Sequence, residues 1–371
     1  MTSVMDRRDW IRSSALATAA WAFGRDRISG ADEAAGTNGG IIYLDQNENP
    51  HGISGKARKA IIDTIKLANR YPGDEMAELR DLIAAREGVP NDHVVLGAGS
   101  TEIFSIAGLL YGADGKEVLL AEPTYSGFKG CIGRIKGKLH SVPVDGRWEH
   151  DLDEMARRLT ANASLVYICN PNNPTGTIVD SGKLRSFCES APRSALVFVD
   201  EAYGDLVEDP RYSSMVGLVA KQGNVMIART FSKIHGLAGM RVGYGLARPE
   251  IIAEFRRIQT NFAPLSQLSI AAAKASLTDA EFLSLSKKQN AEARASFYQL
   301  LDKLGRQPIP GSQTNFVIFP IDRKPEEFAD EFRKRHNIVL RPFEFLEKKW
   351  IRVSMGTKNE MARLAAALQK P

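Results

Sequence analysis

Short apolar runs alternate with amphipathic stretches along most of the chain from Ile41 onward. This alternation is typical of an α/β protein with a mainly parallel sheet, because each helix carries the chain from one strand to the next. The apolar runs predict strands at residues 94–96, 118–121, 165–168, 196–199, 225–228 and 242–246. We expect helices between these strands.

The pattern changes in the last quarter of the chain. A long, polar, helix-prone stretch over 279–304 leads into short strands and a closing helix, with the strands expected near Phe316, Ile338 and Ile351. We therefore predict a large domain over 71–278. A smaller domain is expected from 41–70 together with 279–371.

Residues 1–40 differ from the rest of the chain. The adjacent pair Arg7 and Arg8, a bulky apolar pair, a basic residue and a small apolar stretch over 13–24 follow one another in that order. This order resembles a twin-arginine export signal followed by a linker and predicts a periplasmic protein; the alternatives are an amphipathic helix that packs on the body, and a cytoplasmic location. The apolar stretch is shorter than the roughly 20 residues that span a bilayer, so we expect no stable membrane insertion.

Composition narrows the function classes. The 371 residues are 43% hydrophobic and 25% charged, which is enough for two domains with sizeable cores. The formal net charge of +5 is small and its Lys and Arg residues are scattered among Asp and Glu, so no nucleic-acid partner is expected. The cysteines show no Cys-x-x-Cys or Cys/His spacing, which predicts neither a disulfide framework nor a metal site.

Polar residues stand at the ends of two predicted strands. Asp200 directly follows the run 196–199, and Lys233 comes shortly after the run 225–228, among small and hydroxyl residues. Ligands collect beyond the carboxyl ends of parallel strands, so we expect both side chains at one edge of the sheet. Asp200 could instead cap a helix, whereas a lysine in this position is poorly explained as a surface residue.

Several motifs occur in a fixed order that is specific as a set. Ser-Lys at 232–233 followed by Gly-Leu-Ala-Gly-Met-Arg at 236–241, after Asn-Pro-Asn-Asn-Pro-Thr-Gly at 170–176 and Val-Asp-Glu-Ala-Tyr at 199–203, resembles the fold type I aminotransferases that depend on pyridoxal phosphate (PLP), class I/II. The segments 44–50 and 70–72 are similar to the histidinol-phosphate aminotransferase family. The resemblance covers the chain from about Ile41 to its end.

The resemblance implies a fold and an activity. The fold is α/β, PLP-transferase fold type I, with a mainly parallel sheet between helices in the large domain and a smaller α+β domain. The activity is transamination with pyridoxal 5'-phosphate as cofactor. The amino donor is an amino acid or an amino-phosphate such as histidinol phosphate, and the acceptor is a 2-oxo acid.

The resemblance also implies roles around the cofactor ring. Lys233 would hold the cofactor as a Schiff base and move the proton, while Asp200 would keep the pyridine nitrogen protonated. Asn173 and Tyr203 match the donors to the phenolic oxygen, although the Asn-Pro run around Asn173 is also strong turn chemistry. Tyr125 matches the aromatic residue that stacks on the ring, and an ordinary core tyrosine is the alternative.

The cofactor phosphate needs several donors and positive charge. The run 97–102 follows a predicted strand and begins an apolar helical stretch, so its backbone N–H groups can face an anion. By resemblance the phosphate site consists of Gly99, Ser100, Thr101, Ser232 and Arg241. Tyr71 would reach it from the neighbouring subunit, so a homodimer with a shared active site is expected.

Substrate binding is expected near the C-terminus. Arg352 lies inside an apolar strand, where an unpaired guanidinium is costly, so it should meet an anion. The resemblance assigns it, with Asn47, to the substrate, and Arg341 to a substrate phosphate; Arg341 could also be a surface charge. Between the two arginines the family often has a glycine-rich turn, which residues 343–349 lack, so we expect a reshaped distal pocket.

Other chemistry is compatible with the same motifs. A PLP-dependent lyase, decarboxylase or racemase differs only in which substrate bond is broken, and sequence alone does not separate these. A non-catalytic PLP-binding sensor usually carries a DNA-binding module, and the stretch before Ile41 is short for one.

Overall fold

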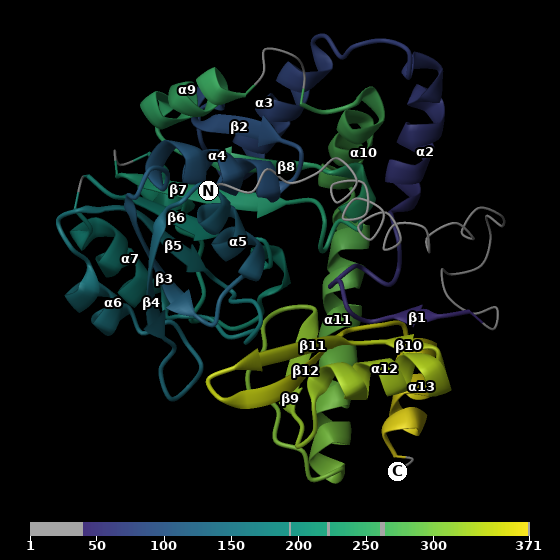
Figure 1. The fold of residues 1–371 in the computed structure, drawn as a ribbon. Helices are drawn as coiled ribbons and strands as arrows, with labels where there is room; N and C mark the ends of the chain where they lie inside the picture. The colour runs from purple at the N-terminus through teal and green to yellow at the C-terminus, as the bar shows by residue number, and fades with distance from the viewer. Residues whose placement is uncertain (1–39, 193, 221–222, 260–263, 370–371) are drawn as a thin grey trace, which may run out of the picture.

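The computed structural model describes residues 40–192, 194–220, 223–259 and 264–369, shown as a ribbon in Figure 1. The predicted export signal over residues 1–40 lies almost wholly outside these residues. The expected α/β fold is confirmed: helices cover both faces of one large sheet, and a second, smaller set of strands and helices lies below it in Figure 1.

The large sheet has seven strands in the order β2-β8-β7-β6-β5-β3-β4. Its members are β2 (Val94–Gly97), β3 (Glu117–Glu122), β4 (Lys138–Pro143), β5 (Ala163–Cys169), β6 (Leu196–Asp200), β7 (Val225–Thr230) and β8 (Gly243–Leu246). Strands β3, β4, β5, β6 and β7 are parallel to one another, and β8 pairs antiparallel with β7 and β2. All strands predicted from apolar runs are confirmed. Strand β4 was not predicted, because this edge strand has Val142 as its one buried residue and therefore no apolar run.

Two apolar clusters enclose the large sheet, one on each face. The strands alternate between them: in β6, Leu196 and Phe198 face one cluster, while Val197 and Val199 face the other. The first cluster is covered by α4 (Ser100–Tyr111), α5 (Ser126–Arg134) and α9 (Pro249–Ile258). The second is covered by α3 (Glu75–Glu87), α6 (Leu152–Arg158), α7 (Ser181–Ser190), α8 (Val216–Val219) and α10 (Gln267–Leu277). Single 3₁₀ turns connect some of these elements, at η1 (Ile65–Leu67), η2 (Asn91–His93), η3 (Gly204–Leu206) and η4 (Ala238–Met240).

The C-terminal part has its own core. An antiparallel sheet in the order β11-β12-β9 consists of β9 (Phe316–Pro320), β11 (Arg341–Phe345) and β12 (Lys348–Ser354). It packs against α11 (Ala280–Lys303), α12 (Pro325–His336) and α13 (Lys358–Leu368). The predicted helix over 279–304 and the closing helix are therefore confirmed.

The hairpin between β11 and β12 was not predicted. Phe345 pairs with Lys348, so the turn consists of Leu346 and Glu347, which have φ angles of 49° and 59°. Two-residue turns with positive φ at both positions favour glycine or asparagine, because a Cβ is strained there. The segment that lacks the family's glycines nevertheless makes a tight turn, with Arg341 and Arg352 at its open end.

The segment 41–70 contacts both parts of the molecule. β1 (Ile42–Tyr43) pairs in parallel with β10 (Ile338–Val339) of the C-terminal part. In contrast, α2 (Gly55–Thr64) packs against α10 and so lies beside the large sheet. The domain division predicted from the sequence places all of 41–70 in the smaller domain, whereas the contacts of this segment change between β1 and α2.

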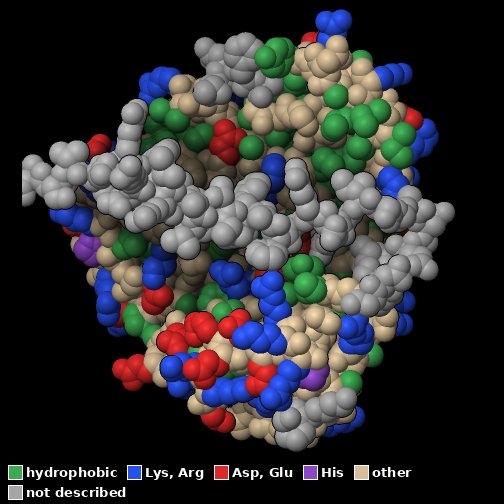
Figure 2. Space-filling model, turned by 45° about the vertical axis from the view of Figure 1, so that its right-hand side comes forward, with side chains coloured by type: hydrophobic (Ala, Val, Ile, Leu, Met, Phe, Trp, Pro, Cys, Tyr) green, Lys and Arg blue, Asp and Glu red, His purple; other side chains and the backbone are tan. Residues whose placement is uncertain are grey.

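The surface charge and the helix lengths concern possible nucleic-acid and membrane partners. Figure 2 shows acidic and basic side chains next to one another on the lower part of the molecule, so this face carries charges of both signs. Among the described residues, every helix is too short or too polar to cross a bilayer.

Candidate active site

An open cavity of about 430 Å³ lies beyond the carboxyl ends of β5, β6 and β7, where the large sheet meets the C-terminal part. Residues from almost the whole described chain line it, from Asp45 to Arg352. The cavity brings together most of the side chains predicted from the sequence, namely Asn47, Ser100, Thr101, Tyr125, Asn173, Asp200, Tyr203, Ser232, Lys233, Arg241, Arg341 and Arg352. Gly99 lies directly behind the lining, next to Arg241. Tyr71 lies on the surface with 79% of its side chain exposed.

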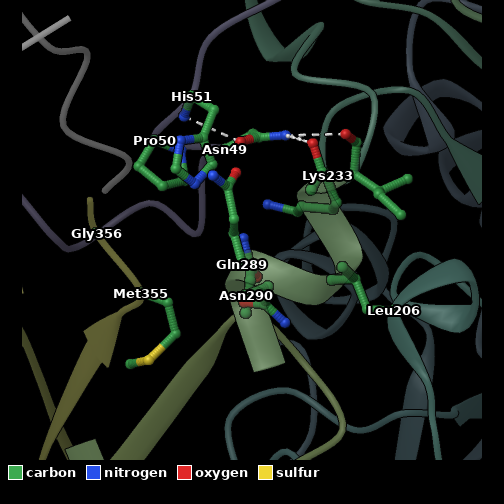
Figure 3. A pocket seen from close by; sticks show the side chains of 12 residues that line it. Asn49, Pro50, His51, Leu206, Lys233, Gln289, Asn290, Met355 and Gly356 are labelled. Carbon is green, nitrogen blue, oxygen red and sulfur yellow. Dashed lines mark hydrogen bonds between the residues drawn. The ribbon is translucent and has the colours of Figure 1, made fainter. Parts of the chain in front are cut away.

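Lys233 follows β7 and lines both this cavity and a smaller one, whose lining also includes Asn49, Gln289 and Asn290 (Figure 3). Its Nζ donates to the carbonyl oxygens of Gln46 and Asn47, both at 3.2 Å. Burial, and after it the positive charge of Arg352, lowers the pKa of Lys233 to about 8. A substantial fraction of the amine is therefore neutral near pH 8, and only the neutral amine is a nucleophile.

Asp200 ends β6 with its carboxyl group buried at the cavity floor. Oδ1 accepts from the backbone N–H of Ala202 at 3.1 Å and Oδ2 from the hydroxyl of Tyr167 at 2.8 Å. Burial raises the pKa of Asp200, and these two hydrogen bonds act in the opposite direction because they stabilise the ionised form. The alternative role as a helix cap does not apply, since the next 3₁₀ turn, η3, has Tyr203 as its N-cap.

Arg352 connects two ends of the cavity. Its Nη1 donates to Asn173 Oδ1 and its Nη2 to the carbonyl oxygen of Asp45, each at 2.7 Å. The guanidinium also lies over the rings of Phe316 and Phe343, at 5.1 and 5.2 Å from their centroids. We expected Arg352 to meet an anion; among the described residues its hydrogen-bond partners are neutral oxygens, so an anionic ligand in the cavity would supply the missing charge.

Asn47 joins the N-terminal segment to this network. Its Nδ2 donates to the hydroxyl of Tyr203 at 2.9 Å, and its backbone N–H donates to Ser354 Oγ at 2.8 Å. The Ser354 hydroxyl in turn donates to Asn47 Oδ1 at 2.9 Å. Asn173 Nδ2 lies 3.5 Å from the same Tyr203 hydroxyl. The two side chains predicted to contact the ring oxygen of the cofactor, Asn173 and Tyr203, are thus neighbours.

The N-terminus of α4 faces the other end of the cavity. Gly99 precedes the helix with φ 81° and ψ 165°, and a Cβ at this position would lie 2.4 Å from Arg241 Nη2. The absence of a side chain lets the guanidinium lie against the start of the helix, beside Ser100. Arg241 Nη1 also donates to Ala238 O at 2.9 Å and lies 3.4 Å from Ser232 Oγ.

This cradle suits a phosphate dianion. Backbone N–H groups at a helix N-terminus and a neighbouring guanidinium both favour negative charge, and the hydroxyls of Ser100, Thr101 and Ser232 line the same space. At the other side of the cavity are the amine of Lys233 and the carboxyl group of Asp200. The described residues therefore fit a ligand that carries a phosphate at one end and an amine-reactive carbonyl group at the other, as pyridoxal phosphate does.

Tyr125 lies in the cavity wall as expected. Its ring contacts Phe104 edge-on, with centroids 5.9 Å apart. Burial raises the pKa of its hydroxyl, which keeps the phenol neutral. The ring is thus available to a flat ligand as an apolar surface held from behind by Phe104.

Several residues that line the cavity were not predicted as site residues. Cys169, interpreted as a buried thiol, ends β5 and lines the cavity. Phe343 and Asp45 contact Arg352 and are also in the lining. Cys169 could have been found from its place at the end of an apolar run. The contacts of Asp45 and Phe343 depend on segments that meet only in the folded protein.

Comparisons with known proteins point in one direction. A family model described as aminotransferase class I and II matches residues 40–368. The histidinol-phosphate aminotransferase of Moorella thermoacetica is 35% identical over 331 residues, which cover 89% of this chain and 85% of that protein. Histidinol-phosphate aminotransferase 2 of Ralstonia nicotianae is 34% identical over 332 residues, which cover 89% of this chain and 88% of that protein.

Solved structures agree with the sequence relatives. The histidinol-phosphate aminotransferase of Sinorhizobium meliloti, in complex with pyridoxal-5'-phosphate, has a TM-score of 0.83 and 28% identity, covering 88% of this chain and 89% of that chain. The L-threonine-O-3-phosphate decarboxylase of Porphyromonas gingivalis, at 19% identity, has a TM-score of 0.78 and covers 89% of this chain and 98% of that chain. The second likeness concerns the fold alone, because two different reactions are named for proteins with this architecture.

Proposed function

The chain belongs to the class I and II aminotransferases, and we propose that it transfers the amino group of a donor such as histidinol phosphate to a 2-oxo acid. The similarity to known aminotransferases confirms the expected family, the transaminase activity and the pyridoxal phosphate cofactor. Bound pyridoxal phosphate supplies an electron-accepting ring that stabilises the negative charge left when a proton leaves the substrate carbon.

The proposed cofactor roles follow from the geometry. Lys233 would hold the cofactor covalently through Nζ, and its amine, once free, would move the proton at the substrate carbon. Asp200 would keep the pyridine nitrogen protonated. Tyr125 would contact the ring, and Asn173 and Tyr203 would donate to its phenolic oxygen. The N-terminus of α4 would hold the phosphate together with Gly99, Ser100, Thr101, Ser232 and Arg241.

The single observation that carries the substrate proposal is the position of Arg341 and Arg352. They pair directly across β11 and β12, and both line the cavity that contains Lys233. Like charges directly opposite one another destabilise a sheet unless an anion lies between them. Arg352 is buried, and burial lowers its pKa to about 10, with Arg341 acting in the same direction. A carboxylate or a phosphate ester on the substrate would offset this cost, with Asn47 fixing the segment that accepts Arg352 Nη2.

A panel of amino donors tests the proposal. The purified enzyme is mixed with histidinol phosphate, histidinol and common amino acids, and the conversion of the cofactor from its aldehyde to its amine form is followed by absorbance. Faster conversion with histidinol phosphate than with histidinol supports the assignment of Arg341 and Arg352 to an anion. If histidinol reacts equally well, the phosphate assignment is wrong. Release of CO₂ during turnover would indicate decarboxylation instead.

Assembly is part of the proposal. Tyr71 is 79% exposed, and the same segment carries Ile62 and Ile65, each 62% exposed, and Leu67 at 38%. Exposed apolar side chains gathered on one segment are typical of a protein interface. A homodimer that covers this segment would bring Tyr71 to the phosphate end of the partner's cavity.

Export is the remaining part. The order of residues at 7–24 favours translocation of the folded, cofactor-loaded enzyme. Fusing residues 1–40 to a reporter tests this: export that persists at full efficiency when Arg7 and Arg8 are both replaced by lysine would rule out a twin-arginine signal. A fusion with both arginines intact that stays in the cytoplasm would instead support a cytoplasmic enzyme.

A further inference from the structure

A residue outside the cavity contacts the carboxyl group on which the cofactor chemistry depends. Tyr167 lies on β5, its side chain is fully buried, and it is not among the residues that line the cavity. Its hydroxyl donates to Asp200 Oδ2 at 2.8 Å. The two residues come from neighbouring parallel strands, with Tyr167 opposite Phe198, two positions before Asp200 on the same face of β6.

The ring of Tyr167 has little freedom to move. It stacks on Phe128 with centroids 3.9 Å apart and planes 9° apart, and it stacks on Phe198 at 6.0 Å and 22°. Stacking on both neighbours fixes the ring, and therefore the direction in which the hydroxyl points. The donor reaches Asp200 already oriented, so the hydrogen bond costs little side-chain entropy.

The contact matters because the carboxyl group is buried. The charged groups near Asp200 have opposite effects on its ionisation: Lys233 favours the ionised carboxylate and Glu201 disfavours it. The side chains of Tyr125 and Cys169 are also near Asp200 and line the cavity. Among the groups that favour the ionised carboxylate, the Tyr167 hydroxyl has the largest effect. Removing it would leave one neutral donor, the N–H of Ala202.

We propose that Tyr167 is a positioning residue whose hydroxyl keeps Asp200 ionised and oriented, and so determines how firmly a proton stays on the pyridine nitrogen of the cofactor. The inference rests on the proposed role of Asp200. A carboxylate that loses a hydrogen-bond donor in a dry site becomes a stronger base. The shared proton then moves toward Asp200, and the ring accepts electrons less well.

The chain offers a matched control. Tyr111 on α4 also donates its hydroxyl to a carboxylate, Glu254 Oε2 on α9, at 2.5 Å, and neither residue lines the cavity. Tyr167→Phe and Tyr111→Phe each remove one phenol-to-carboxylate hydrogen bond and keep the aromatic ring. A difference between the two variants therefore reports the position of the bond rather than the loss of a buried hydroxyl.

The test uses holoenzyme loaded with pyridoxal phosphate that carries ¹⁵N at the pyridine nitrogen. In Tyr167→Phe the ¹⁵N resonance should move toward the position of an unprotonated pyridine, and cofactor affinity should fall on the order of tenfold. Tyr111→Phe should match the wild type in both. The proposal is overturned if the resonance and affinity of Tyr167→Phe equal those of Tyr111→Phe while near-ultraviolet circular dichroism shows all proteins folded.

A third variant separates this inference from the function on which it rests. Asp200→Asn removes the carboxylate itself, and its ¹⁵N resonance should move at least as far as that of Tyr167→Phe. If Asp200→Asn leaves the resonance unchanged, the proposed role of Asp200 fails. If Asp200→Asn shifts it and Tyr167→Phe does not, only the role of Tyr167 fails.

Discussion

Arg352 Nη1 donates to Asn173 Oδ1 at 2.7 Å, and this hydrogen bond joins the substrate end of the cavity to the cofactor end. Asn173 uses its carbonyl oxygen here, so its amide N–H groups face Tyr203 and the proposed position of the cofactor ring. An anion bound at Arg352 must therefore change the surroundings of Asn173. With the proposed roles of these residues, one side chain would link substrate binding to cofactor electronics.

Replacing Arg352 with alanine should weaken the use of anionic donors strongly. Arg352 is 6% exposed, so the alanine variant loses a buried charge-assisted contact to the anion of the donor. The fall in kcat/KM should correspond to a loss of about 2–5 kcal/mol in transition-state stabilisation. Arg341 is exposed, and Arg341→Ala should cost less and affect phosphate-bearing donors most. Steady-state kinetics on donors with and without phosphate measure this, and equal losses for neutral and anionic donors would contradict it.

Lys233→Ala should abolish covalent attachment of the cofactor. Lys233 is the one lysine among the described residues that line the cavity, so without it borohydride reduction should leave the protein unlabelled in mass spectrometry. Lys287, whose Nζ donates to Val207 O at 2.6 Å and which does not line the cavity, serves as the control, because Lys287→Ala should be labelled like the wild type. A reduced adduct on a different lysine of Lys233→Ala would assign the attachment elsewhere.

The pH dependence of cofactor attachment should follow the pKa of Lys233. Only the neutral amine attacks, so in cofactor-free protein the attachment rate should rise with pH and level off above a midpoint of about 8, instead of the ordinary lysine value of 10.5. Burial is the main cause and Arg352 the next, so Arg352→Ala should move the midpoint upward. Stopped-flow absorbance at a series of pH values measures both midpoints; a wild-type midpoint near 10.5 would show that the amine is not desolvated.

Gly99→Ala should weaken the phosphate end of the site. A Cβ there meets Arg241 Nη2, and the backbone angles are ones that glycine alone adopts easily, so the variant should lose about 1–3 kcal/mol of stability and bind pyridoxal phosphate less tightly. Gly239 is the control, because a Cβ at that position meets no atom within 4 Å. Thermal unfolding and fluorescence titration compare the two variants, which should not behave alike.

Mixing two inactive variants tests the shared site. Lys233→Ala lacks the attachment amine and Tyr71→Ala lacks the residue expected from the partner, so each homodimer should be impaired at both sites. A mixed dimer contains one site with both residues intact, and random exchange of subunits should restore about a quarter of wild-type activity. Activity that does not rise above the sum of the separate variants would place Tyr71 outside the partner's site.

The buried strands were predictable because their signal is local. Parallel strands enclosed on both faces are apolar along their length, as in β5 and β6, so the run itself identifies the element. β4 gave no such signal, because it lies at the sheet edge and Val142 is its one buried residue. The hairpin turn at Leu346 and Glu347 was not predicted because both residues have positive φ angles, which usually occur at glycine or asparagine.

The side chains of the cavity were predictable from motifs, but their partners were not. Asp200 and Lys233 could be identified at strand ends, whereas the hydrogen bond from Tyr167 to Asp200 joins residues 33 positions apart on neighbouring strands. Within an apolar run, Tyr167 reads as an ordinary core residue. The hydrogen bond from Arg352 to the amide oxygen of Asn173 likewise joins residues 179 positions apart.

The hydrogen bond between Asn47 and Ser354 spans 307 positions of the chain. Closing a loop of this length carries an entropic cost that only the folding of the intervening chain can offset. Asn47 and Ser354 should therefore meet late during folding, after the large sheet has formed. Partly folded molecules would then have an intact cradle for phosphate and yet no enzyme activity.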